Sequence, residues 1–335
     1  MPPIQPPVFP ISMLSSHLLA LSFGATYVGS LYLSKNARLR FSKSPATPPT
    51  GPEASQYVRQ RRIEPGSRDD PAVIRARLTA VTFATLFNCT IVYYLVSRST
   101  LPSSDHSLGS TLALLGLSPA WPTSVLPYLQ TPLLFLGPLY ASSYLTQSLP
   151  GQAHYSFEFQ FIKTFCTWIG FRNYIWGPFT EEIVFRACVL SVYAMAGAPR
   201  WKMIAFAPLV FGLAHVHHAW EVYNRLGRTQ NALKQAAMSA LFQTLYTTLF
   251  GAHTSYLFLR TSSLLPPLTA HVFCNIMGVP QMGLEIKSFP AKKRAIQIAY
   301  AIGIISFIYT LVPWTETPGS VFWLGPERFW RGVAA

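Results

Sequence analysis

Long apolar runs, separated by short polar segments, recur along the whole chain. Half of the 335 residues are hydrophobic and 11% are charged, whereas a soluble domain carries about a quarter charged residues. A helix needs about 20 mostly apolar residues to cross a bilayer. These runs predict an all-α, polytopic membrane protein with about eight transmembrane helices that enclose a cytosol-facing catalytic cavity. The predicted spans are 14–33, 78–97, 127–147, 174–196, 203–220, 236–258, 264–285 and 296–314.

The segments between the spans suggest five parts. Residues 34–77 are rich in Pro, Ser and Arg, include the runs 45–52 and 59–62, and lack apolar periodicity. Such a composition is typical of a solvated loop. The expected parts are an N-terminal segment with the first span (1–33), a basic Pro-rich cytosolic loop (34–77), spans two and three (78–173), a catalytic core (174–285), and the last span with its tail (286–335).

The basic residues are distributed unevenly between the two sides of the membrane. If loop 34–77 is cytosolic, 19 of the 26 Lys and Arg residues share its side, six lie opposite, and Arg186 lies inside a span. Cytosolic loops carry such an excess. The formal net charge of +14 is therefore explained by membrane orientation, and we expect no nucleic-acid partner.

Ionisable side chains inside predicted spans are candidates for function, because burying them in lipid is costly. Apart from Glu285 at the very end of the seventh predicted span, Glu181 and Glu182 are the only acidic residues inside a span. Glu182 and Arg186 are at positions i and i+4, which share a helix face and favour an ion pair. Glu181 points about 100° away and is free to face another group. The alternative for these residues alone is a structural ion pair, with Glu181 facing water.

Two further polar clusters occur in later spans. His215 lies near the end of the fifth span, and His271 and Asn275 lie at i and i+4 in the seventh. In the predicted topology these three residues and Glu181 fall in the same half of the bilayer. Such convergence is what a catalytic site requires.

The residue types suit hydrolysis of an amide bond by an activated water molecule. A glutamate and a histidine can take a proton from water, and a second histidine with an asparagine amide can stabilise the oxyanion. The sequence has no Gly-x-Ser-Gly serine site and no His-Glu-x-x-His motif, and its three aspartates (Asp69, Asp70 and Asp105) lie in loops. We favour a metal-free mechanism without a cofactor, while a zinc ion held by Glu181, His215 and His271 stays an alternative.

The three clusters resemble the motifs of the CaaX protease and bacteriocin-processing superfamily. They read Glu181-Glu182-x-x-x-Arg186, Phe211-x-x-x-His215 and His271-x-x-x-Asn275. The flanking segments TEEIVFRACVL, FGLAHVHH, LFGAHTSYLFLRT and HVFCNIMG are similar to the type II CaaX prenyl endopeptidases, or Ras-converting enzymes. The resemblance covers about residues 174–283.

That resemblance implies a multi-pass endopeptidase of the endoplasmic reticulum membrane with its active site toward the cytosol. Its substrates would be prenylated CaaX C-termini, such as those of Ras-like GTPases and lipidated peptides, presented from membrane lipid. By motif, Glu181 and His215 would activate water, His271 and Asn275 would form the oxyanion hole, and Glu182 and Arg186 would support them. A non-catalytic membrane chaperone or scaffold of the same fold, and a transporter that uses Glu181 and His215 as a proton relay, are the competing hypotheses.

Overall fold

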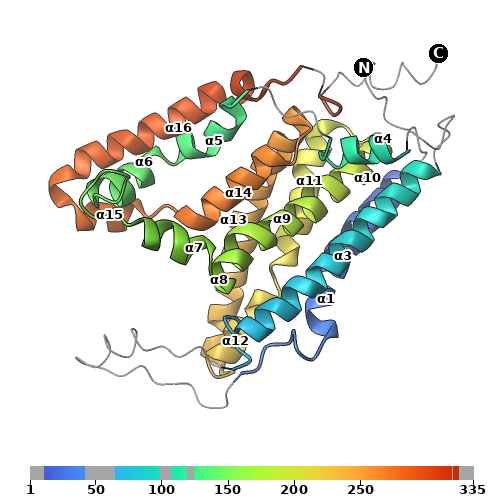
Figure 1. Cartoon of the computed structure of the whole chain (residues 1–335), viewed down its shortest axis with the longest axis horizontal. Coiled ribbons are helices and arrows are strands. Elements are labelled where there is room, and N and C mark those ends of the chain that lie inside the picture. Colours follow the sequence, from blue (N-terminus) through green and yellow to red (C-terminus); the bar gives the residue numbers. More distant parts are fainter. Residues whose placement is uncertain (1–10, 42–64, 99–106, 119–123, 319, 324–335) are drawn as a thin grey trace.

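The described part of the protein is entirely helical (Figure 1). The computed structural model describes residues 11–41, 65–98, 107–118, 124–318 and 320–323, which form helices and no strands. The predicted all-α class is confirmed for these residues. The Pro-rich and Arg-rich runs 45–52 and 59–62 lie outside them.

The first helices begin at well-formed caps. The Ser12 hydroxyl accepts from the Ser15 N–H, and the Asp70 carboxylate accepts from the Ala72 N–H directly before Pro71. Such caps satisfy N–H groups that have no partner inside the helix. The elements of this half are α1 (Met13–Leu33), α3 (Pro71–Ser97), α4 (Ser107–Leu114), α5 (Leu126–Leu134), α6 (Leu136–Leu139) and η2 (Tyr140–Leu145).

The central run of helix alternates between α and π geometry. The wider π turns place side chains at angles that differ from the 100° per residue of an α-helix. The first short elements are η3 (Glu158–Ile162), α7 (Lys163–Phe165) and α8 (Trp168–Gly170). The continuous run that follows is η4 (Phe171–Trp176), α9 (Gly177–Glu182), η5 (Ile183–Cys188) and α10 (Val189–Met195).

The remaining helices pack against this central run. Figure 1 shows α11, α13 and α14 beside α9 and α10, with α1 and α3 on the opposite flank. Helix α16 packs against α5 and α6 at the other edge of the molecule. These elements are α11 (Arg200–Ala214), α12 (His218–Arg225), α13 (Gln230–Thr261), α14 (Leu265–Met277), α15 (Met282–Ser288), η6 (Pro290–Lys292) and α16 (Lys293–Thr315).

Three helical stretches of the described chain are long and apolar enough to cross a membrane: Pro71–Ser97, Arg200–Arg225 and Pro290–Thr315. The predicted seventh span, 264–285, differs from the helix observed there. Helix α14 ends at Met277, where Gly278 takes a positive φ of 68°. Its 13 residues extend about 20 Å, less than the roughly 30 Å of a bilayer core.

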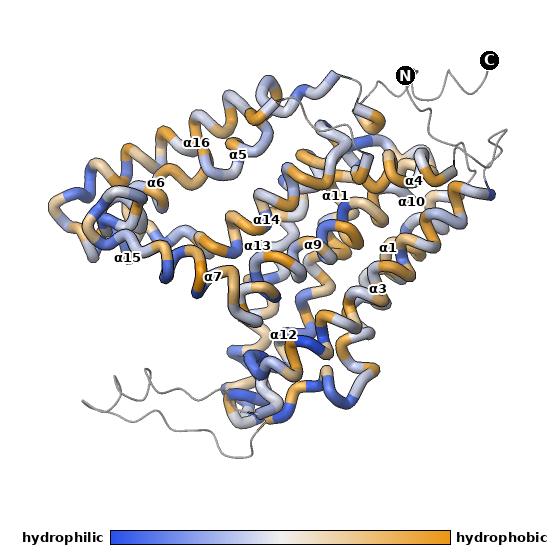
Figure 2. Tube along the Cα trace, viewed as in Figure 1, coloured by the Kyte–Doolittle hydropathy of each residue, from blue (hydrophilic) through white to orange (hydrophobic). Residues whose placement is uncertain are grey.

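The distribution of polarity fits a protein surrounded by lipid. Large apolar side chains point outward along α13 and α16, including Leu245, Leu249, Ile305 and Ile308, which are all more than half exposed. Ionisable residues such as Glu182, Arg186 and His271 are instead buried. Figure 2 shows mostly apolar residues along the long helices and polar residues gathered around α12. With the apolar spans, this arrangement indicates a multi-pass membrane protein.

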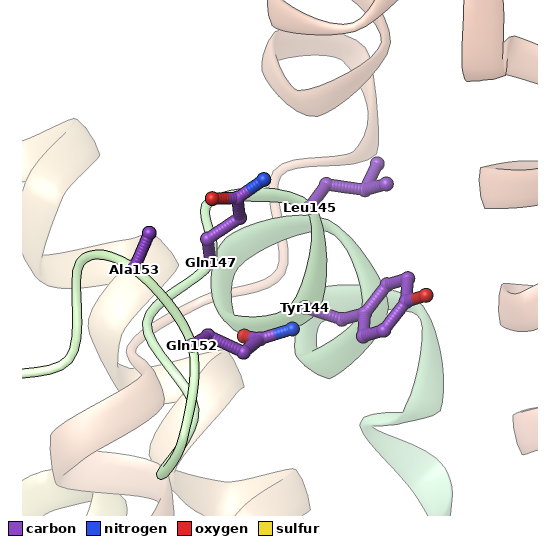
Figure 3. A pocket seen from close by; sticks show the side chains of 5 residues that line it. All are labelled: Tyr144, Leu145, Gln147, Gln152 and Ala153. Atoms are coloured by element: carbon purple, nitrogen blue, oxygen red, sulfur yellow. The ribbon is translucent and has the colours of Figure 1, made fainter.

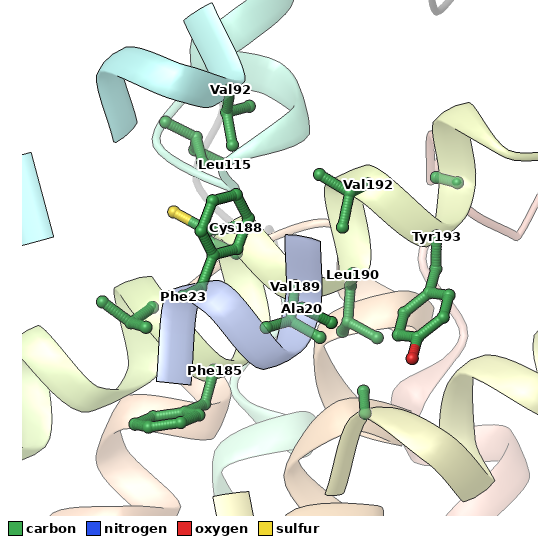
Figure 4. Packing of buried hydrophobic residues seen from close by; sticks show 14 of the residues in the cluster. Ala20, Phe23, Val92, Leu115, Phe185, Cys188, Val189, Leu190, Val192 and Tyr193 are labelled. Atoms are coloured by element: carbon green, nitrogen blue, oxygen red, sulfur yellow. The ribbon is translucent and has the colours of Figure 1, made fainter. Parts of the chain in front are cut away.

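An apolar core joins the central run to α1 and α3. Figure 4 shows Phe23 of α1, Val92 of α3 and the side chains of η5 and α10 packed together. Nearly every residue from Ile183 to Met195 is buried. The segment that carries Glu181 and Glu182 is therefore fixed on both sides by packing.

Helices α11 and α13 lie close together at Gly212, and this glycine allows a testable prediction. A Cβ there would overlap the Thr248 hydroxyl and lie 3.0 Å from the Thr244 carbonyl oxygen. We expect Gly212→Ala to lower the free energy of unfolding by about 1–3 kcal/mol through overpacking. Thermal unfolding in detergent measures the effect.

The matched control is Gly29→Ala in α1, where an added Cβ meets no described atom within 4 Å. An alanine there should be neutral or stabilise the helix by up to about 1 kcal/mol. Equal melting temperatures for the two variants would contradict close packing at Gly212.

Candidate active site

A buried ion pair connects two residues of the first motif. Glu182 Oε2 lies 3.1 Å from Arg186 Nε, and both side chains are at most 1% exposed. This is the i, i+4 pair that the sequence predicts. The Arg186 Nε–H also donates to the Thr254 hydroxyl on α13, at 2.8 Å. The guanidinium carbon lies 4.1 Å from the Phe211 ring centroid, so a cation–π contact adds to the compensation of the buried charge.

His271 of α14 contacts both acids of α9. Its Nδ1 lies 2.6 Å from Glu182 Oε1, and its Nε2 lies 3.7 Å from Glu181 Oε2. An ionised carboxylate only accepts hydrogen bonds, so the His271 Nδ1 carries a proton and donates to Glu182. His271 can then donate from Nε2 only as an imidazolium. Two acids, one guanidinium and one imidazole therefore form a single cluster.

The two adjacent acids have different surroundings. The Glu182 side chain is fully buried between Arg186 and His271, whereas the Glu181 side chain is 26% exposed. The 3.7 Å separation between Glu181 and His271 exceeds an ordinary hydrogen bond. Glu181 is therefore the acid that can exchange a proton with water, and Glu182 is the one that orients its neighbours.

His215 follows the last residue of α11, with its tautomer fixed by the backbone. Its Nδ1 lies 2.8 Å from the Phe211 carbonyl oxygen. A carbonyl only accepts, so Nδ1 carries a proton, and in the neutral imidazole Nε2 keeps a lone pair. The Phe211 ring lies 4.6 Å from the His215 ring and 6.1 Å from the His271 ring, measured between centroids. Within the described chain no hydrogen bond or ion pair joins His215 to Glu181, and Phe211 links the two histidines.

Asn275 lies in the last turn of α14 and is exposed. Its Nδ2 donates to the Asn173 carbonyl oxygen at 2.9 Å. The neighbouring Arg172 pairs with Asp69 at 3.1 Å. The asparagine amide is therefore held by the backbone of η4, and its second N–H is the donor that remains for a ligand.

The sequence-based prediction of the site did not include several residues that surround it. Thr254 and Phe250 of α13 contact Arg186 and His271, respectively, and Asn173 holds Asn275. Thr254 and Phe250 belong to the segment LFGAHTSYLFLRT, so the family resemblance was a signal for them. The sequence contains no comparable signal for Asn173, because a backbone carbonyl is present at every residue.

Thr254 allows a test of the buried ion pair. We expect Thr254→Val to lower the free energy of unfolding by about 1.5–3 kcal/mol, because the variant loses a hydrogen bond to a charged group. Thr247→Val on the same helix is the control, since the Thr247 hydroxyl donates only to carbonyls of its own helix. Thermal unfolding of the two variants measures the difference, and equal stability would contradict a role for the Thr254 hydroxyl.

Two cavities occur elsewhere in the described chain. The larger, about 300 Å³, is lined by Tyr144, Leu145, Gln147, Gln152 and Ala153 at the turn after η2 (Figure 3). The smaller, about 150 Å³, lies beside His217 and α12. Neither cavity is lined by Glu181, His215, His271 or Asn275.

Comparison with known proteins gives a consistent assignment. Residues 163–277 match the family model described as type II CAAX prenyl endopeptidase Rce1-like. The chain is 31% identical to the probable CAAX prenyl protease 2 of Schizosaccharomyces pombe, over 90% of this chain and 93% of the relative. It is 32% identical to the human CAAX prenyl protease 2, over 88% of this chain and 80% of the relative. No solved structure matches the chain significantly.

The matched region contains the three polar clusters, since it begins before Glu181 and ends after Asn275. The two relatives extend the similarity over most of the chain. The predicted family resemblance is thus confirmed. The chain belongs to the Rce1-like family of type II CAAX prenyl endopeptidases.

Proposed function

We propose that this chain removes the C-terminal tripeptide from prenylated CaaX proteins with a water molecule activated by Glu181 and His215. One observation carries the proposal: the motifs of α9 and α14 meet, with His271 between Glu181 at 3.7 Å and Glu182 at 2.6 Å. The names of the relatives support the reaction class. No covalent intermediate forms in this mechanism.

The reaction proceeds by general base catalysis. Glu181 takes a proton from water with the help of the unprotonated His215 Nε2, and the water oxygen bonds to the scissile carbonyl carbon. His271 Nε2–H and the second N–H of Asn275 donate to the resulting oxyanion. The C–N bond then breaks, and the proton held by Glu181 passes to the amine of the departing tripeptide.

Glu182 and Arg186 support this chemistry by position. The Glu182 carboxylate binds His271 Nδ1 and so directs His271 Nε2 toward Glu181. Arg186 balances the charge of Glu182. A supporting pair of this kind keeps the catalytic groups in place before the substrate arrives.

The substrate's lipid provides most of its binding energy in this proposal. Each buried CH₂ of a prenyl chain contributes about 0.8 kcal/mol, while the tripeptide remains polar. The scissile bond of a Ras-like GTPase or another lipidated peptide would then lie near the membrane surface. The family resemblance supports a place in the endoplasmic reticulum membrane. The 19 Lys and Arg residues on the predicted cytosolic side support eight spans and a site open to the cytosol.

The decisive experiment compares a farnesylated CaaX peptide with the same peptide lacking the lipid, using purified protein in lipid vesicles. Release of an intact tripeptide from the lipidated peptide alone is the expected result. Release from neither peptide by folded protein would leave the scaffold hypothesis. Normal complementation in cells by a His271→Ala, Asn275→Ala double variant would support that hypothesis too.

A chelator distinguishes the two versions of the hydrolytic mechanism. We expect tripeptide release to continue unchanged after incubation with EDTA or 1,10-phenanthroline, because a Glu/His base needs no metal to activate water. The measurement is the initial rate before and after removal of the chelator. A loss of activity that added Zn²⁺ restores would favour a zinc ion bound by Glu181, His215 and His271.

A further inference from the structure

A cavity of about 150 Å³ is lined in part by His217 and by Trp220 and Glu221 of α12. It is formed by the end of α1 and the residues after it, by α3, and by the turn and helix that follow α11. Its lining includes the aromatic side chains of Phe41 and Trp220 and the basic side chains of Arg38, Arg77 and His217. The volume exceeds the roughly 30 Å³ that one water molecule occupies in the liquid, so the cavity has room for the end of a peptide.

The two arginines of this cavity are positioned by their Nε atoms. Arg38 Nε donates to the Tyr32 carbonyl at 2.6 Å, and Arg77 Nε donates to the Ala37 carbonyl at 2.8 Å. These bonds hold the guanidinium groups through Nε, and no other described residue forms a hydrogen bond with their Nη atoms. Neither arginine forms an ion pair with another described residue.

The charges of the lining favour an anion. Glu221 is the acidic residue of the lining, and its carboxylate lies 3.7 Å from His218 Nδ1. The lining has two guanidinium groups and one carboxylate, so these groups give it a positive net charge. A guanidinium is the side chain that best matches the planar fork of a carboxylate.

The cavity also lies at a defined distance from the candidate catalytic residues. The ring centroids of His215 and His218 are 5.8 Å apart, and those of His218 and His217 are 4.0 Å apart. The rings of His215 and His217 are thus separated by at most about 10 Å, which is the length of three extended residues at about 3.3–3.6 Å each. A tripeptide whose scissile bond lies at His215 is therefore long enough to reach this cavity.

We propose that the cavity binds the α-carboxylate of the substrate's last residue, with Arg38 and Arg77 as the cations that recognise it. This inference rests on the proposed function. Phe41 and Trp220 form the apolar wall for the side chain of that residue. The separation between this carboxylate subsite and His215 then determines the length of the released peptide. The enzyme removes three residues because three residues fit between His215 and the cavity.

The test uses two farnesylated peptides of the same sequence, one with a free C-terminal carboxylate and one with a C-terminal amide. Values of kcat/KM are measured for the wild type, for Arg38→Gln, Arg77→Gln double variants, and for Arg77→Lys. We expect the wild type to prefer the free acid by at least about tenfold, because charge-assisted hydrogen bonds are lost with the amide. The double variant should lose this preference through slower cleavage of the acid alone, and Arg77→Lys should keep part of it.

Arg75→Gln is the matched control. Arg75 lies on the same helix and is exposed, and its guanidinium contacts the Trp168 ring instead of the cavity. The variant removes one positive charge, as Arg77→Gln alone would. We expect its acid-to-amide ratio to equal that of the wild type.

Four results would overturn the inference. Equal cleavage of acid and amide by the wild type would refute carboxylate recognition while leaving the proposed function intact. If a folded double variant keeps the preference for the free acid, residues other than Arg38 and Arg77 recognise the carboxylate. If the double variant cleaves both peptides more slowly, and only in vesicles that contain phosphatidylserine, the cavity binds a lipid phosphate. Cleavage of neither peptide by the folded wild type would refute the proposed function itself, and the inference with it.

Discussion

Replacing Glu181 with glutamine should abolish tripeptide release while leaving the protein folded. The amide has the same shape as the carboxylate but does not take a proton from water at neutral pH, so the rate should fall by about 10²–10⁴-fold. Because the Glu181 side chain is 26% exposed and 3.7 Å from its nearest charged partner, its loss removes little stabilisation. The measurement is kcat for a farnesylated peptide, with the melting temperature recorded on the same sample.

The matched comparison for Glu181→Gln is Glu285→Gln. Glu285 accepts a hydrogen bond from the Tyr300 hydroxyl in another part of the chain. This variant has the same change in charge, and its activity should equal that of the wild type. Activity within twofold of the wild type in Glu181→Gln would remove Glu181 from the mechanism.

Replacing the next residue should have a different effect, because Glu182→Gln destabilises the protein as well as inactivating it. The change leaves the Arg186 charge buried without its counterion. It also replaces one carboxylate oxygen with an NH₂ group, so the side chain no longer has an acceptor for both Arg186 and His271 Nδ1. Breaking one partner of a buried ion pair typically costs about 3–5 kcal/mol. Thermal unfolding in detergent and the yield of monodisperse protein are the measurements.

A double variant separates the two roles of Glu182. Glu182→Gln combined with Arg186→Met removes both charges, so most of the lost stability should return. Activity should not return, because His271 still lacks the carboxylate that orients it. Full stability in the single Glu182→Gln variant would mean that the Arg186 charge is compensated by another group.

Part of the site could be predicted from the sequence because it depends on spacing within one helix. The Glu182–Arg186 pair follows from the i, i+4 positions, and the long apolar runs gave the helical class. Which residues of two different helices meet depends on how each helix is rotated about its axis. The spacing of residues within one helix carries no information about this rotation. The bond from His271 to Glu182 was missed for this reason.

Two features of the backbone explain the remaining differences. The π turns of η4 and η5 flank α9, so an angle of 100° per residue does not hold across the central run. Helix α14 ends at Met277, and Asn275 therefore lies in a last turn that is exposed. The hydrogen bond from Asn275 to the Asn173 carbonyl depends on how α14 packs against η4, which the spacing of residues within one helix does not define.

The pairing of Glu182 with Arg186 also bears on how the chain is synthesised. His271 follows Glu182 by 89 positions, which at about 5–20 residues per second means a delay of roughly 5–20 s. During that delay the nascent segment with Glu182 must enter the bilayer without its imidazole partner, although each charge at a helix centre costs about 2.5–3.5 kcal/mol to insert. A guanidinium four residues away on the same helix neutralises the carboxylate from the start, so the segment can wait in the membrane until the later helix emerges from the ribosome.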